Sequence, residues 1–120
     1  MTAAFDMLPG LQRVRDRFIA LLKDRQLLIA RHTLAAWDGV TAQEVNENLH
    51  AVQHILHQIA GSAGSIGLAE LGEQAQECEM LINSHLESAH VDKPRCPEHV
   101  AAALGQFVAE CQVLTDAAAA

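Results

Sequence analysis

Histidine side chains recur at helical spacing in the middle of the chain, at positions 50, 54 and 57. Imidazole changes its charge near neutral pH, and it can act as a nucleophile, a proton carrier or a metal ligand. His57 is followed one helical turn later by Gly61, and then by Gly64 and Gly67. Three glycines within seven residues need a reason, because glycine in a helix interior costs about 0.5–1 kcal/mol relative to alanine. We interpret His57 as a reactive imidazole and the glycines as clearance for a molecule that approaches it.

The apolar residues of the same segment predict the direction in which His57 points. They recur in alternating steps of three and four, the pattern of a narrow bundle seam, at Val45, Leu49, Val52, Leu56, Ile59, Ala63 and Ile66. At about 100° per residue, His57 lies more than a quarter turn from the centre of this seam. His50, His54 and Gly61 share its outward face. The spacing argues against a buried core histidine and leaves two interpretations, a reactive site and an ordinary surface histidine.

Four amphipathic segments can position this outward face. We expect helices from Pro9 to between Arg31 and Trp37, from a capping box at residues 41–44 to Gly64 or Gly67, over residues 68–86, and from Pro97 to the alanine tail. The apolar positions expected to face the core of the first helix are Leu11, Val14, Phe18, Leu21 or Leu22, Leu28 and Ile29. Residues 87–97 form the one long loop.

The predicted fold class is all-α, an antiparallel up-down-up-down four-helix bundle. We expect residues 1–120 to form a single domain, with residues 1–8 as an N-terminal arm or short helix and residues 117–120 as a frayed tail. Alanine and leucine dominate and aromatic residues make up 3%, which favours helix over sheet.

Composition and charge argue against several classes of protein. The formal net charge of −7 argues against nucleic-acid binding, for which a basic patch is the usual footprint. No apolar run approaches the ~18–20 residues of a membrane span, and the N-terminus lacks a signal-peptide pattern, so we expect a cytoplasmic protein with no membrane contact. The three cysteines show no CxxC spacing, so neither a disulfide framework nor a zinc finger is indicated.

The glycine-rich segment resembles a known motif. The pattern His57-x-x-x-Gly61-Ser62-Ala63-x-x-x-Gly67, with Leu68 and Leu71 after it, resembles the histidine-containing phosphotransfer (HPt) domain. The motif covers about fifteen residues. The predicted four-helix layout, with the histidine on the second long helix, extends the resemblance to nearly the whole chain.

The resemblance implies a phosphorelay intermediate. His57 would accept a phosphoryl group from an aspartyl phosphate on a response-regulator receiver domain and pass it to another receiver, in a relay that begins at a hybrid histidine kinase. The chain would have no ATP site, no metal and no cofactor of its own, because magnesium would belong to the receiver. It would act as a monomer. The residues expected to dock the receiver are His50, Gln53, His54, Gln58, Ala60, Gly61 and Gly64.

One position departs from the family pattern and keeps alternatives open. The family usually has lysine three residues after the histidine, where this chain has Ala60. That lysine is expected to steady the phosphoryl charge, so its absence favours, as one alternative, an adaptor that docks receivers without carrying phosphate. The other alternative is a metal-binding bundle, since His50, His54 and His57 stand at i, i+4 and i+7.

Overall fold

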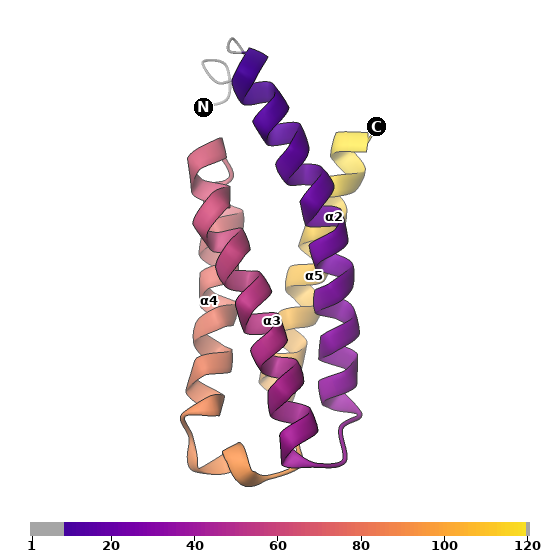
Figure 1. Cartoon of the computed structure of the whole chain (residues 1–120), viewed down its shortest axis with the longest axis vertical. Helices are drawn as coiled ribbons and strands as arrows, with labels where there is room; N and C mark the ends of the chain where they lie inside the picture. The colour runs from indigo at the N-terminus through magenta and orange to yellow at the C-terminus, as the bar shows by residue number, and fades with distance from the viewer. Residues whose placement is uncertain (1–8, 120) are drawn as a thin grey trace.

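The computed structural model describes residues 9–119 as a bundle of four long helices. These are α2 (Pro9–Trp37), α3 (Ala42–Ala63), α4 (Ala69–Leu86) and α5 (Glu98–Ala119), with two short 3-10 turns between them, η1 (Gly64–Ile66) and η2 (Ala89–Asp92). Residues 9–119 contain no strand, so the predicted all-α four-helix bundle is confirmed. Successive helices run in opposite directions along the long axis, as Figure 1 shows.

The predictions made for the two ends of the chain have different outcomes. The arm predicted at residues 1–8 lies outside the described residues, as does Ala120. The last helix is regular to Ala119, so residues 117–119 continue α5 where we expected fraying. None of the helices in the described range is both long and apolar enough to cross a bilayer.

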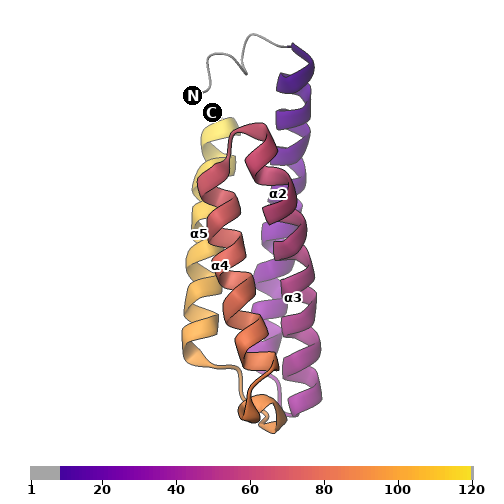
Figure 2. The same cartoon turned by 90° about the vertical axis from the view of Figure 1, so that its left-hand side faces the viewer.

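α3 packs against α2 on one side and against α4 on the other, and α5 packs against α2 (Figures 1 and 2). All seven residues of its predicted seam are buried, and Ile55 is added to them. The other helices supply buried apolar residues at the predicted spacing, which are Leu71, Ala75, Cys78 and Ile82 of α4 and Val100, Leu104, Phe107 and Cys111 of α5. One continuous core therefore fixes α3 and leaves its remaining face toward solvent.

The predicted core face of α2 is partly wrong. The residues of α2 that are buried are Phe18, Leu22, Gln26, Ile29 and Ala36, whereas Leu11, Val14, Leu21 and Leu28 are exposed. The first turns of α2 extend beyond the end of α3, as Figure 1 shows, so residues there have less of the bundle to pack against. Farther along, the contact face is narrower than the apolar stripe, and leucines at its edge remain in water.

Local sequence fixes both ends of α3. The side chain of Thr41 accepts a hydrogen bond from the backbone N–H of Glu44 at 3.1 Å, which confirms the predicted N-cap. Beyond the other end, η1 continues the chain to Gly67, which has φ +83°, a left-handed conformation that favours glycine. This turn reverses the chain from α3 into α4 and sets the two helices side by side.

Candidate functional site

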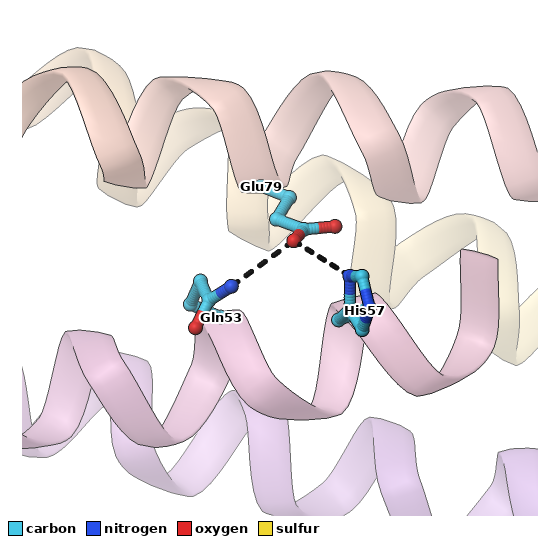
Figure 3. Close-up of polar contacts among 3 residues, drawn as sticks. All are labelled: Gln53, His57 and Glu79. Carbon is cyan, nitrogen blue, oxygen red and sulfur yellow. Dashed lines mark hydrogen bonds and ion pairs between the residues drawn. The ribbon is translucent and has the colours of Figure 1, made fainter. Parts of the chain in front are cut away.

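His57 projects from the solvent face of α3, and its side chain is 73% exposed. Its ring is nevertheless held, because Nδ1 lies 2.9 Å from Oε2 of Glu79 on α4. Figure 3 shows both side chains directed toward each other across the gap between the two helices. The prediction that His57 lies outside the core is confirmed, and the structure adds a carboxylate partner.

Glu79 is fixed by a second contact from α3. Gln53 donates a hydrogen bond from Nε2 to the same oxygen, Oε2, at 3.0 Å, and the Glu79 side chain is only 12% exposed (Figure 3). A carboxylate can only accept hydrogen bonds, so Nδ1 of His57 must carry the proton that it shares with Glu79. Nε2 is then the ring nitrogen whose lone pair is available when the imidazole is neutral.

The glycines beside His57 have different structural reasons. Gly67 is explained by its positive φ. A Cβ built on Gly61 or Gly64 would meet no heavy atom within 4 Å outside the helix's own nearby backbone, so packing among the described residues does not require glycine at either position. Both are exposed. Part of the helix beside His57 therefore carries no side chain and lies open to solvent.

The other residues predicted to dock a partner divide into two groups. His50, His54 and Gln58 are exposed on α3 along with Gly61 and Gly64, and Gln58 lies 3.4 Å from His54 through their Nε2 atoms. Gln53 and Ala60 are half-buried instead. Gln53 binds Glu79, and the backbone of Ala60 passes close to Gly72 of α4.

The metal-binding alternative finds no support in this geometry. Among residues 9–119 no group of three histidine, cysteine or acidic residues is arranged to hold a metal ion. Burial raises the pKa of the Cys78 thiol to about 11 and that of Cys111 to about 12, so neither thiolate forms readily.

Sequence reasoning missed Glu79. It directly follows the predicted core residue Cys78, so its place at the edge of α4 could be derived from periodicity. Its pairing with His57 depends on the register between α3 and α4, which the contacts of Asn46 with His85 and of Gln53 with Glu79 define.

Comparison with known protein families gives a match over most of the chain. The family model described as the Hpt domain matches residues 13–117. No curated protein and no solved structure matches the chain. The match supports a phosphotransfer role in two-component signalling and an interaction with response-regulator receiver domains or kinases. Members of the matched family carry phosphoryl groups and are not kinases.

Proposed function

The chain belongs to the Hpt domain family, and from that premise we propose that His57 is its phosphoacceptor, which receives a phosphoryl group from a receiver-domain aspartyl phosphate and passes it to another response regulator. The observation that carries the proposal is the combination of an exposed imidazole with a largely buried, fixed carboxylate on its Nδ1. An ordinary surface histidine has no need of such a partner.

The transfer step follows from the tautomer. The lone pair of Nε2 attacks phosphorus, the N–P bond forms, and the P–O bond to the aspartyl carboxyl breaks, so that the carboxylate leaves with the electron pair. The phosphorylated imidazole ring is positively charged, because Nδ1 keeps its proton when Nε2 bonds to phosphorus. Glu79 accepts that proton's hydrogen bond and stabilises the charge. Transfer to the next receiver reverses the same bonds.

The open backbone beside His57 supports the approach of a large partner. An aspartyl phosphate lies within a receiver domain, so the receiver's loops must reach the imidazole before the phosphorus can. Gly61 and Gly64 leave that path free of side chains, and His50, His54 and Gln58 border it. We propose that the chain supplies no metal or cofactor and that magnesium is bound by the receiver.

The non-phosphorylated adaptor remains the competing function, because Ala60 stands where the family usually has lysine. The test is phosphotransfer from a radiolabelled receiver to the protein and to His57→Gln, with His99→Gln, an exposed histidine on α5, as the control. We expect acid-labile label in the protein and in the control, and none in His57→Gln. Equal labelling of His57→Gln would refute the assignment. Absence of label from every form, with receiver binding retained, would identify an adaptor.

A further inference from the structure

A second group of polar side chains lies at the C-terminal end of α4, where the chain crosses to α5. The chain has eight lysines and arginines, and after residue 31 they are limited to Lys93 and Arg95 in this connection. His85, His90 and His99 accompany them. Five nitrogen-bearing side chains therefore gather in one place on a chain whose formal net charge is −7.

These five side chains line an open pocket of about 490 Å³ between the end of α4, the connecting loop and the start of α5. Its volume falls within the ~300–1,000 Å³ typical of small-molecule sites. Ser84 and Ser88 add hydroxyl groups to the lining, and no carboxylate belongs to it. None of the lining residues comes from α3, so the pocket is separate from the site at His57.

The loop that carries the cations is anchored rather than loose. Asn46 of α3 donates from Nδ2 to the carbonyl of Val91 at 2.7 Å, so its Oδ1 faces His85 and accepts from Nε2 at 3.3 Å. Ser88 accepts from the backbone N–H of His90 at 3.2 Å, and Cys96 is buried beneath the loop's end. A fixed loop holds its charged residues in place before any ligand arrives, which reduces the entropy lost on binding.

The positive charges in the pocket lack partners of opposite sign. Within residues 9–119 the ion pair between His57 and Glu79 is the one that falls within 4 Å, so neither Lys93 nor Arg95 is paired there. Glu87, Asp92 and Glu98 follow nearby in sequence but are exposed and do not line the pocket. Burial lowers the pKa of His85, and repulsion from the neighbouring His90 and His99 lowers it further.

We propose that this pocket binds a ligand with a dianionic phosphoryl group, as in orthophosphate, a phosphomonoester or a diphosphate. Arg95 offers a planar fork that suits phosphate oxygens, Lys93 offers a point charge, and His90, His99 and Ser84 supply further donors. Acidic residues on the other helices do not prevent binding, because charges more than ~8 Å away are largely screened at physiological salt, whereas Glu87, Asp92 and Glu98 adjoin the pocket and oppose binding there. The proposal is independent of phosphotransfer at His57.

The experiment is an NMR titration of the ¹⁵N-labelled protein with orthophosphate, glycerol phosphate and pyrophosphate at constant ionic strength. We expect saturable amide shifts confined to residues 84–99, with a dissociation constant of about 1 mM or tighter for the best ligand. The ligand that binds most tightly identifies the source of the phosphoryl group. Chloride that produced the same shifts, or the absence of saturation by all three ligands, would overturn the proposal.

The double variant Lys93→Gln/Arg95→Gln should bind at least about tenfold more weakly. Lys23→Gln/Arg31→Gln on α2 is the matched control, because it removes the same net charge from exposed positions outside the pocket. The control should bind as the parent does, and circular dichroism checks that both variants keep their helices. Equal affinity in the pocket variant, or equal loss in the control, would reduce the effect to general electrostatics and refute the site.

Discussion

Glu79 of α4 and His57 of α3 lie 22 positions apart in the sequence and are joined by a 2.9 Å contact between Oε2 and Nδ1. The contact crosses the interface between two helices, so the orientation of the imidazole depends on how α3 and α4 pack. Gln53 fixes the same carboxylate oxygen from one turn earlier on α3. The exposed ring is thus oriented by a largely buried residue that a partner need not touch.

We predict that Glu79→Ala slows phosphorylation of His57 by about tenfold or more, because a hydrogen bond to a charged group contributes roughly 1.5–3 kcal/mol. Imidazole ¹⁵N shifts should also change, since Nδ1 would no longer be held as the protonated nitrogen. Glu79→Gln should restore the tautomer through its amide oxygen and recover part of the rate. Glu73→Ala, an exposed change on the same helix, is the control. A Glu79→Ala protein with the parent's rate and imidazole shifts would contradict the role.

Gly61 provides a second prediction, which concerns space. Gly61→Leu should leave the helix content unchanged, because a Cβ there meets nothing within 4 Å, and should block phosphotransfer by obstructing the receiver. Gly61→Ala should be tolerated and should stabilise the fold by about 0.5–1 kcal/mol. Gly105→Leu on α5 is a matched control, since that exposed helical glycine is equally free of contacts. Normal transfer through Gly61→Leu would mean that the receiver does not approach across this position.

The third prediction concerns pH and His85. Burial and the neighbouring His90 and His99 lower its pKa in the folded protein, so the unfolded chain binds its proton more readily. The stabilisation from this residue is therefore present above the unfolded pKa of about 6.5 and is lost as the pH falls through the lower, folded value.

Urea unfolding at about pH 8 and about pH 5 measures the effect. The free energy of unfolding should fall less on acidification in His85→Gln than in the parent, because the amide can still donate to Asn46 but does not titrate. His54→Gln is the control, because His54 is exposed and is not among the residues that lower the pKa of His85. An unchanged pH dependence in His85→Gln would exclude His85 as a source of acid sensitivity.

Periodicity within each helix was enough to predict most of the fold. The seam from Val45 to Ile66, the cap at Thr41 and the start of α5 are as expected, because each depends on residues close together in sequence. The face of α2 was partly misassigned, since Leu28 fits the apolar period but lies beyond the width of the contact. Apolar spacing defines which side of a helix prefers burial, whereas the neighbouring helix decides how much of that side is covered.

The site, too, was predictable only as far as the periodicity of a single helix allows. The outward direction of His57 follows from its angle to the seam of α3. The engagement of Gln53 and the presence of Glu79 do not follow, because both depend on the register between α3 and α4. The pocket near Lys93 depends on three segments that meet in space. Its lining residues, between positions 84 and 99, follow neither a helix period nor a strand period, so the sequence pattern did not predict it.

The last prediction concerns Ala60, where the chain departs from the family's usual lysine. Ala60 is half-buried on the side of α3 that faces α4, one turn from His57. A lysine there could lay its methylenes against the bundle and keep its ammonium in water. Phosphate carries roughly −1.5 to −2 charges near neutral pH, so the ammonium should favour the phosphorylated state by about 1 kcal/mol or less, and salt should weaken the effect.

We therefore predict that Ala60→Lys increases the rate or extent of His57 phosphorylation with little change in thermal stability. Glu79 makes the result informative, because a lysine drawn to that carboxylate would compete with Nδ1 and slow the transfer instead. Ala60→Met, which has similar length and no charge, is the control. The measurement is a transfer time course from one phosphorylated receiver at low and high salt. If Ala60→Lys and Ala60→Met match the parent at both salt concentrations, a cation at this position has no part in transfer, and His50 and His54 become the next residues to substitute.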